Sequence, residues 1–393
     1  MKMRSKKFSA AIRKLTALAL TLASIVGVLA GCVIKFEFDD ADILAKTSVI
    51  EIKEIKKHGN VVLDVTFAEM REMGLETGDV ITVSVGESKY EMPIGTSFSD
   101  VDSGEMICRF DEEDDEVALA VNMGSFAEKT GIAEKQTIEE DPGYKWTVKI
   151  SELMITLKEK RGYLDEYRVR NLTRSNARED YPSLTDEEFA NFRAVPVRGI
   201  KANTFYRSST PIDPAIGRSE YAMRAIEQAG IKSILNLADS VETMESYDAY
   251  AGSYYGGCAV INPEMSYDFE SAEFGDKVKT CVEFIINGEG PFLIHCKEGK
   301  DRTGILCAIL ECYAGASAEE VFYDYMLTYV NYYGIDSSDS VYSVILNKNL
   351  VKTLCALLKV ESLKGINLKE KAREYLISIG VTDEELKALS EKF

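Results

Sequence analysis

The segment that most restricts the possible folds of this chain is residues 292–313. Phe292, Leu293 and Ile294 have the composition of a buried strand, and residues 303–313 have that of a buried helix. The segment HCKEGKDRTG, residues 295–304, connects the two. A strand that passes through a polar loop directly into a helix is the building unit of α/β folds, and it places the loop at a helix N-terminus.

The connecting loop has the residue types that binding and attacking a phosphate require. Backbone N–H groups and the helix dipole favour an anion there, and Gly299 allows the backbone to turn tightly and approach a ligand closely. Arg302, six residues after Cys296, can clamp two phosphate oxygens. The same positive surroundings favour the thiolate form of Cys296, which is a nucleophile for phosphorus.

The pattern His-Cys-x5-Arg-Thr-Gly resembles the signature of the cysteine-based protein tyrosine phosphatase superfamily. The resemblance covers roughly residues 190–335 and is greatest to secreted bacterial tyrosine and lipid phosphatases, lipoproteins among them. It implies a phosphatase in which Cys296 forms a phosphocysteine that water then hydrolyses. It extends upstream to the segments Phe205-Tyr206-Arg207-Ser208-Ser209 and Asn236-Leu237-Ala238-Asp239-Ser240.

The resemblance also implies roles for the rest of the loop. Arg302 would hold phosphate oxygens, Thr303 would donate a hydrogen bond to the Cys296 sulfur, and His295 would orient the loop. Arg207 could extend the basic patch, together with the arginines within residues 168–178. The remaining substrate-binding positions would be Lys297, Glu298, Gly299, Lys300 and Gly304.

The acid that protonates the leaving group has three candidates. Asp268 lies 28 residues before Cys296, near the spacing of the movable acid loop in tyrosine phosphatases. Asp301 stands where some lipid phosphatases of the superfamily carry their acid, and Asp239 is the third candidate. Mycobacterial relatives carry an acidic residue at the position of Asn236, so this chain departs from their pattern there. The sequence leaves these candidates open, because each could instead be a solvated or loop-fixing carboxylate.

Two loop lysines, Lys297 and Lys300, bear on the substrate class. Two cations at the rim suit a substrate with more than one phosphate, and both positions are basic in the tumour-suppressor phosphoinositide phosphatase. Lys300-Asp301-Arg302 also occurs in phosphatases of phosphotyrosine, so phosphorylated proteins and phosphoinositides are both predicted substrates. The formal net charge of −19 argues against nucleic acid as a partner.

The N-terminus has the features of an export signal. Residues 1–31 carry six basic residues and no acidic one, and residues 15–30 are apolar but short for a membrane span. Leu29-Ala30-Gly31-Cys32 resembles a bacterial lipobox, which implies lipidation of Cys32 and anchoring to the outer face of the membrane. An ordinary signal peptide or a marginal membrane anchor is the alternative.

Residues 32–164 are predicted to form a β-rich domain, a small barrel or sandwich. Short apolar stretches at 33–38, 61–65 and 80–85 alternate with turn signals. Residues 73–80 and 122–127 resemble the β-barrel half of bacterial S-adenosylmethionine hydrolases, from which we take a barrel shape and no activity. The acidic run 111–116 lacks the ligand spacing of an EF-hand and is predicted to be a solvated hairpin tip.

Residues 165–191 are predicted to be a charged linker, and residues 192–393 an α/β phosphatase domain with a mainly parallel sheet, flanking helices and a helical C-terminal extension. Capping boxes are predicted at 317–320 and 382–385. The predicted strands are residues 231–237, 258–261 and 291–295, and the predicted helices are residues 218–229, 241–254, 272–286, 303–313, 341–360 and 368–379.

Three other functions compete with this prediction. Rhodanese-like sulfurtransferases and arsenate reductases also place a cysteine near a helix N-terminus, but the intact Arg302-Thr303-Gly304 favours a phosphatase. A non-catalytic phosphate-binding module would normally lack Cys296 or Arg302. The phosphatase could also be accessory to a ligand-binding barrel. With two histidines and no CxxC pair among eight cysteines, no metal site and no cofactor are predicted.

Overall fold

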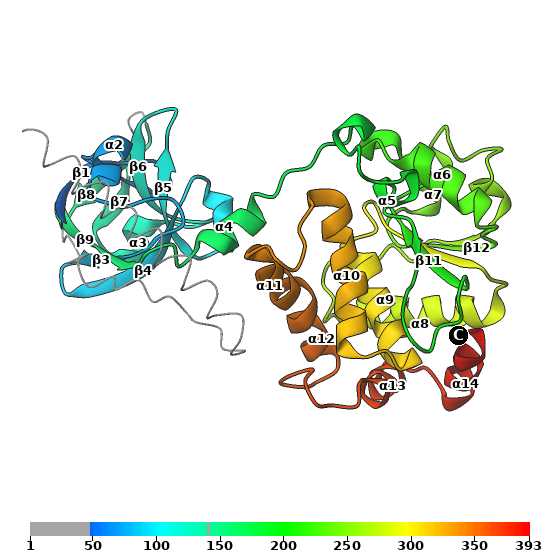
Figure 1. The fold of residues 1–393 in the computed structure, drawn as a ribbon. Coiled ribbons are helices and arrows are strands. Elements are labelled where there is room, and N and C mark those ends of the chain that lie inside the picture. Colours follow the sequence, from blue (N-terminus) through cyan, green and yellow to red (C-terminus); the bar gives the residue numbers. More distant parts are fainter. Residues whose placement is uncertain (1–47, 140–141) are drawn as a thin grey trace, which may run out of the picture.

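The structure is a computed structural model that describes residues 48–139 and 142–393. It has an N-terminal β-barrel and a C-terminal α/β part (Figure 1). The predicted signal peptide (1–31), the lipidation site Cys32 and the predicted strand at 33–38 lie outside the described residues. Across the two described ranges, every helix is too short or too polar to span a membrane.

The N-terminal part is a closed barrel of seven strands, in the order β1-β2-β6-β5-β4-β3-β9. In β3, Ile81, Val83 and Val85 alternate with less buried residues and point into the core. The predicted barrel is thus confirmed. Its strands are β1 (Ser48–Ile55), β2 (Val61–Leu63), β3 (Val80–Val85), β4 (Ser88–Gly95), β5 (Met106–Asp111), β6 (Glu116–Val121) and β9 (Glu152–Glu159). It also has the helices α2 (Phe67–Glu72) and α3 (Phe126–Thr130), the turn η2 (Phe98–Asp100) and the hairpin β7 (Ala133–Thr137) with β8 (Tyr144–Val148).

The acidic run at 111–116 forms the turn of a β-hairpin. Asp111, at the end of β5, pairs with Glu116, at the start of β6, and the residues between them are exposed. The prediction of a solvated hairpin tip is confirmed.

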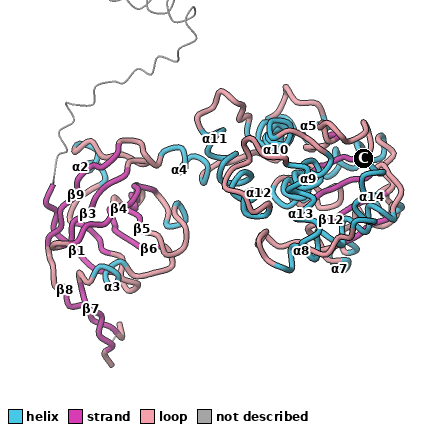
Figure 2. Tube along the Cα trace, turned by 90° about the horizontal axis from the view of Figure 1, so that it is seen from below, coloured by secondary structure: helices cyan, strands magenta, loops and turns pink. Residues whose placement is uncertain are grey.

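Residues 165–191, predicted as a linker, contain the helix α4 (Leu164–Arg170), the turn η3 (Arg178–Asp180) and the helix α5 (Asp186–Phe189). Helix α4 lies between the barrel and α11 (Figure 2). Arg170 binds Asp102 of the barrel, while Glu166 binds Lys348 of the α/β part. The segment therefore makes ion pairs with both parts of the molecule.

The α/β part has a five-stranded sheet in the order β10-β11-β14-β12-β13, of which only β10 (Arg193–Ala194) is antiparallel. Ser208, His295 and Asn236 are register partners at the carboxyl ends of three neighbouring strands. The segments that carry the sequence resemblance therefore end side by side, with the predicted phosphate loop in the middle. The parallel strands are β11 (Phe205–Ser208), β14 (Phe292–His295), β12 (Ser233–Asn236) and β13 (Ala259–Ile261).

Helices cover both faces of this sheet. Tyr206, Ile234 and Leu293 pack with α6 and α7 on one face, whereas the alternate residues Phe205 and Phe292 pack with α8 and α9 on the other. These helices are α6 (Ser219–Gln228), α7 (Val241–Glu245), α8 (Ala272–Asn287) and α9 (Asp301–Ala314), with the turns η4 (Pro214–Ile216) and η5 (Tyr255–Gly257).

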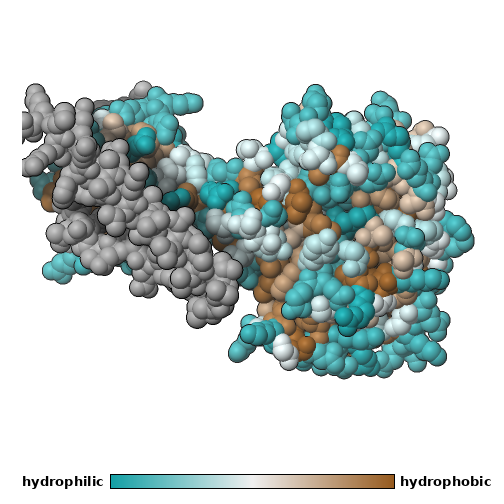
Figure 3. Space-filling view, in the orientation of Figure 1, coloured by the Kyte–Doolittle hydropathy of each residue, from teal (hydrophilic) through white to brown (hydrophobic). Residues whose placement is uncertain are grey.

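The C-terminal extension adds helices beside α9, and hydrophobic side chains gather around them on the face shown in Figure 3. Both predicted capping boxes, Ser317 with Glu320 and Thr382 with Glu385, are confirmed. The extension consists of α10 (Ala318–Tyr333), α11 (Val341–Ile345), a π-helical turn (Leu346–Val351), α12 (Lys352–Leu357), α13 (Leu368–Ser378) and α14 (Asp383–Lys392).

Three predicted helix boundaries were wrong. The helix predicted at 241–254 ends at Glu245, since the chain then enters turns that include Gly252 at φ 73°. The helix predicted at 341–360 contains the π-turn and ends at Leu357. Helix α9 begins at Asp301 rather than at 303, so Asp301 and Arg302 lie in its first turn, not in the loop.

Candidate active site

The loop after β14 has its carbonyl groups fixed from outside. The carbonyl of Lys297 accepts a hydrogen bond from the Thr210 N–H (3.0 Å), and that of Glu298 accepts one from the Tyr332 hydroxyl (2.9 Å). The carbonyl of Gly299 accepts a hydrogen bond from Arg207 (2.8 Å). These donors therefore hold the backbone of the loop by its carbonyl groups.

The N–H groups of the same loop have no such partners. Among the described residues, no acceptor binds the N–H groups of residues 297–302. The last of these groups belong to the first turn of α9, where the helix dipole favours negative charge. The loop thus forms a cradle of donors suited to a tetrahedral oxyanion.

Arg207, predicted to bind substrate, is fully buried, so this prediction was wrong. Its guanidinium pairs with the buried Asp324 and donates hydrogen bonds to the carbonyls of Gly299 and Lys300 (2.8 and 3.4 Å). Burial works to lower the pKa of Arg207, but the charge of Asp324 outweighs this and raises it. Arg207 is therefore a positioning residue, which supports the loop from beneath.

Asn191 is a second support, which the sequence analysis missed. Its side-chain amide donates to the carbonyls of Glu298 and Gly299 (3.2 and 3.3 Å), and its own backbone has a positive φ of 53°. Asparagine adopts this conformation more readily than most residues. A single Asn before a strand gives no sequence signal for such a role.

Gly299 is required by both its conformation and its surroundings. Its φ is 66°, and a Cβ atom on it would lie 2.0 Å from the carbonyl oxygen of Ser208 on β11. The loop can therefore lie close to β11 only with glycine at this position.

Cys296 and His295 lie at the carboxyl end of β14, and both are buried. The His295 Nδ1 atom lies 3.2 Å from the Cys296 carbonyl oxygen, which can only accept, so Nδ1 carries the proton. Nε2 then accepts a hydrogen bond from the Tyr255 hydroxyl (2.8 Å). Burial lowers the pKa of His295 to about 4, so the ring is neutral, and its two hydrogen bonds fix its orientation at the start of the loop.

Arg302 is directed to the carbonyls of Leu237 and Met265 (3.4 and 3.3 Å), and the ring of Tyr267 lies 4.8 Å from its guanidinium carbon. Its Nε has no partner within the described part of the chain, and neither has the buried hydroxyl of Thr303. Unpaired buried donors beside a cradle of N–H groups are available to an anion and to the Cys296 sulfur.

Lys297 does not project freely from the loop. Its ammonium contacts the carboxylates of Asp213 (2.6 Å) and Asp239 (2.8 Å) and the hydroxyl of Tyr247 (2.5 Å). Burial works to lower the pKa of Lys297, but these hydrogen bonds outweigh it and raise the pKa. Asp239, the third acid candidate, is almost fully buried in this cluster and is therefore placed to fix Lys297 rather than to protonate a leaving group.

Lys300 is likewise paired within the loop. It lies 3.1 Å from Glu298 and 3.9 Å from Asp301 and sits over the rings of Tyr329 and Tyr333. Glu298 also pairs with Arg174, the one arginine of residues 168–178 that contacts the loop. The rim thus holds carboxylates beside both of its lysines.

The two remaining acid candidates line one pocket of about 370 Å³. Asp301 is partly buried, and this burial raises its pKa although Lys300 opposes the effect. Asp268 is exposed, and its backbone bonds to Ser266 and Ser271 hold the loop that carries it. The structure therefore brings both carboxylates to the same side of the phosphate loop.

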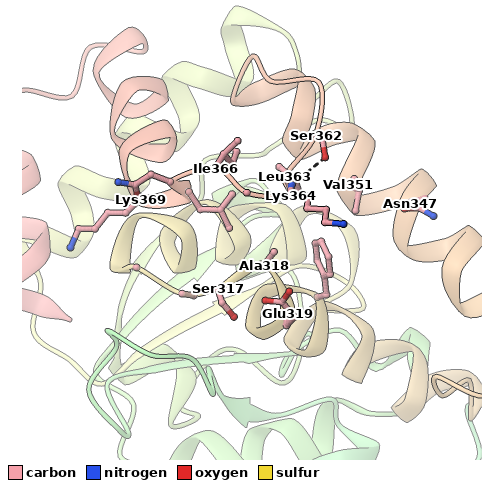
Figure 4. A pocket seen from close by; sticks show the side chains of 16 residues that line it. Ser317, Ala318, Glu319, Asn347, Val351, Ser362, Leu363, Lys364, Ile366 and Lys369 are labelled. Atoms are coloured by element: carbon pink, nitrogen blue, oxygen red, sulfur yellow. Dashed lines mark hydrogen bonds between the residues drawn. The ribbon is translucent and has the colours of Figure 1, made fainter. Parts of the chain in front are cut away.

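A pocket of about 630 Å³ lies elsewhere, between the start of α10 and residues 362–369 (Figure 4). Ser317, Glu319, Lys364 and Lys369 line it, and no residue of the phosphate loop does. Among the described residues, no group of three His, Cys, Asp or Glu side chains is arranged to hold a metal ion.

Comparisons with known proteins match the two parts of the chain separately. Residues 51–139 match the C-terminal domain of the SAM hydroxide adenosyltransferases, in line with the predicted resemblance of the barrel. Residues 187–393, more than half of the chain, match the tyrosine phosphatase family. No curated protein matches the chain.

Solved structures give weak likenesses. An uncharacterized conserved protein from Thermotoga maritima is 20% identical over 28% of this chain and 36% of its own, with a TM-score of 0.23. The core catalytic domain of the PP-IP phosphatase Siw14 from S. cerevisiae, in complex with citrate, is 21% identical over 40% of this chain and 84% of its own (TM-score 0.27). P. aeruginosa TpbA in complex with pTyr is 15% identical over 44% and 86% (TM-score 0.28).

The family match spans the phosphate loop, both of its neighbouring strands and the helical extension. It confirms the resemblance predicted from His-Cys-x5-Arg-Thr-Gly, and it supports phosphatase activity. This chain belongs to the tyrosine phosphatase family.

Proposed function

We propose that the protein hydrolyses phosphotyrosine in proteins through a phosphocysteine on Cys296. The observation that carries this proposal is the cradle around Cys296, in which the carbonyls are fixed outward and the N–H groups of residues 297–302 are unpaired. Such fixed donors stabilise the charge on the phosphoryl oxygens without reorganising during the reaction.

The reaction has two steps. The Cys296 thiolate attacks phosphorus, an S–P bond forms, the P–O bond to the tyrosine breaks, and a carboxylic acid donates its proton to the leaving phenolate. Water then attacks the phosphocysteine, the same carboxylate takes a proton from it, and the thiolate leaves. Arg302 and the loop N–H groups hold the phosphoryl oxygens in both steps, and the Thr303 hydroxyl donates a hydrogen bond to the leaving sulfur.

We assign the acid to Asp301 ahead of Asp268. A general acid must hold its proton near the working pH, and the raised pKa of Asp301 favours this, with burial as the main cause. Its place in the first turn of α9, next to Arg302, keeps it within the site whatever the position of other loops. Asp268 is the alternative that experiment must separate from it.

The rim supports a substrate with one phosphate. Two lysines favour a phosphoinositide with several phosphates, which is the second candidate substrate. Lys297 is, however, paired with Asp213 and Asp239, and Lys300 with Glu298. A second phosphate would have to displace these carboxylates, so we expect phosphotyrosine to be the better substrate.

We also propose that the mature protein is exported and anchored through lipid on Cys32 to the outer face of the bacterial membrane. The lipobox-like Leu29-Ala30-Gly31-Cys32 supports this. Metabolic labelling with a fatty acid, in the parent and in Cys32→Ala, would test it, and equal labelling of both would contradict it.

The main test is turnover of para-nitrophenyl phosphate and of a phosphotyrosyl peptide under reducing conditions. Cys296→Ser should lose about 10⁴-fold or more in kcat, because it lacks the nucleophile. Cys258→Ser, which changes a partly exposed cysteine away from the loop, is the matched control and should keep its activity. A parent that binds vanadate and turns over neither substrate would be a phosphate-binding module, and one that transfers sulfur from thiosulfate would be a sulfurtransferase.

The acid is tested by Asp301→Asn and Asp268→Asn on the same two substrates. Loss of the acid should lower kcat by about 10²-fold or more for phosphotyrosine, and less for para-nitrophenyl phosphate, whose leaving group needs little protonation. We expect this pattern, together with loss of the alkaline limb of the pH–kcat profile, in Asp301→Asn. If Asp268→Asn has it instead, our assignment of the acid is wrong.

A further inference from the structure

The pocket of about 370 Å³ that holds both acid candidates adjoins the phosphate cradle. Asp301 lines this pocket and directly precedes Arg302. Tyr267 lines it as well, and its ring lies over the Arg302 guanidinium. A substrate whose phosphate is held by the loop therefore has the pocket beside it.

One edge of this pocket is basic and comes from the C-terminal extension. Lys348 and Asn349 of the π-turn and Lys352 at the start of α12 line it. Single π-turns within helices are rare and occur often at functional sites. The other charged residues that line the pocket are acidic: Asp268 and Glu270 on the loop before α8, and Asp301 at the start of α9.

The two lysines of this edge differ in how free they are. Lys348 pairs with Glu166 on α4. Lys352 is exposed and makes no salt bridge with any residue of 48–139 or 142–393. The pKa of Asp102 is lowered, mainly by the hydrogen bond from Arg170. The charge of Lys352 makes only a minor contribution to this shift, smaller than those of the Arg170 and Lys348 charges. Lys352 therefore remains available to a ligand in the pocket.

The carboxylates and the lysines of this pocket come from different segments, so they orient an anionic group. The carboxylates repel the group and Lys352 attracts it. The side-chain amide of Asn349, whose Nδ2 donates to the Tyr329 hydroxyl, leaves its oxygen for a peptide N–H. A single acidic side chain of a peptide can point towards Lys352 and away from the carboxylates. An inositol ring with several phosphates would place some of them against Asp268 and Asp301.

We propose that this pocket is a subsite for an acidic residue next to the phosphotyrosine of a protein substrate, with Lys352 as its anion-binding residue. The proposal rests on the proposed function and adds a sequence preference to it. It makes the C-terminal extension part of the substrate-binding surface.

The test compares two phosphotyrosyl peptides that differ only in flanking Glu against flanking Gln, with para-nitrophenyl phosphate as a reference, on the full chain. The parent should prefer the Glu peptide in kcat/KM, and Lys352→Glu should reduce this preference about fivefold or more. Turnover of para-nitrophenyl phosphate should not change, because this substrate has no acidic side chain for Lys352 to bind. Lys364→Glu makes the same charge change beside the other pocket (Figure 4) and should leave the preference unaltered.

The outcomes separate the subsite from the proposed function. A parent that hydrolyses both peptides equally, or a preference that Lys352→Glu does not change, overturns the subsite and leaves the phosphatase intact. A parent inactive on every phosphotyrosyl substrate overturns the proposed function itself. Faster turnover of a short-chain phosphoinositide, lowered by Lys352→Glu, would show that the pocket binds a second phosphate and not a peptide.

Discussion

The barrel and the α/β part bury polar groups in different ways. In the barrel, the buried carboxylates are Asp79 and Asp100, and both oxygens of each accept hydrogen bonds. Asp79 accepts from the N–H groups of Glu76 and Arg161, and Asp100 accepts from two backbone N–H groups and from Asn171. These carboxylates hold turns in place.

In the α/β part, by contrast, several buried groups stay unpaired. Every buried side-chain nitrogen or oxygen without a partner, within the described ranges, belongs to this part or, in the case of Arg174, to the segment before it. Arg207, Arg302 and Thr303 surround or support the phosphate loop, Arg174 pairs with Glu298 of the loop, and Glu311 lies on the helix that leaves it. Arg218, at the start of α6, is the one of these residues that lies apart from the loop. In the barrel, buried polar groups with hydrogen-bond partners hold the backbone in place. In the α/β part, most of the buried polar groups without partners lie around the candidate active site.

The largest effect is expected from the buried arginine beneath the loop. Arg207→Met leaves Asp324 with Arg193 as its one remaining guanidinium partner and releases the carbonyls of Gly299 and Lys300. We expect a loss of about 4 kcal/mol in the free energy of unfolding, measured by denaturant titration, because the buried Asp324 loses one of its two charged partners and the loop loses its support.

Two controls sharpen this prediction. Lys160→Met removes the partner of Asp79 in the barrel and should cost about 1 kcal/mol or less, since Lys160 is partly exposed and Asp79 keeps its backbone bonds. Arg207→Lys keeps a charge beside Asp324 but cannot reach both carbonyls, so kcat should fall at least tenfold with a smaller loss of stability. If Arg207→Met and Lys160→Met lose the same free energy of unfolding, the buried polar groups of the two parts do not differ in how much stability depends on them.

A matched pair of glycines gives the next largest effect. Both Gly299 and Gly104 have positive φ angles, 66° and 87°, but only Gly299 has a backbone oxygen in the path of a Cβ atom. Gly104→Ala should cost about 1 kcal/mol from conformation alone. Gly299→Ala should cost about 3 kcal/mol and lower kcat at least tenfold, because the loop must move away from Ser208.

Thermal unfolding and para-nitrophenyl phosphate turnover measure the two glycine effects together. If Gly299→Ala is as stable and as active as Gly104→Ala, the loop adapts without loss, and the close approach to β11 does not define the cradle.

The smallest effect concerns the protonation of Glu311. Burial first, and the nearby charge of Asp324 second, raise the pKa of Glu311 well above its usual value. The folded protein therefore holds a proton that the unfolded chain releases. The stability that this proton contributes is complete below about pH 4.5 and falls as the pH rises towards the folded pKa, by about 1.4 kcal/mol per pH unit.

Glu311→Gln, which cannot ionise, removes this dependence. Denaturant unfolding from pH 5 to pH 8 should show the variant gaining stability relative to the parent as the pH rises. Asp324 stays ionised in both states over this range, and His295 titrates alike in both proteins, so neither affects the difference. Parallel stability curves would mean that Glu311 is ionised in the folded protein.

The sequence alone predicted the family and the strand, loop and helix that carry its signature. The apolar strand, the loop HCKEGKDRTG and the apolar helix are consecutive, so spacing and local propensity were enough to predict the loop, Cys296 and Arg302 as candidate residues, and the family. The alternating short strands likewise predicted a β-rich N-terminal part, because alternation is a local signal.

Only the tertiary structure decided which charges are free. Arg207 is near the loop in space and looks like a phosphate ligand in the sequence, yet Asp324, 117 residues away, holds it in the core. Lys297 looks like an open cation until Asp213 and Asp239 are placed beside it. A charge is available to a ligand only if no partner neutralises it, and its partners come from segments that the sequence does not place next to one another.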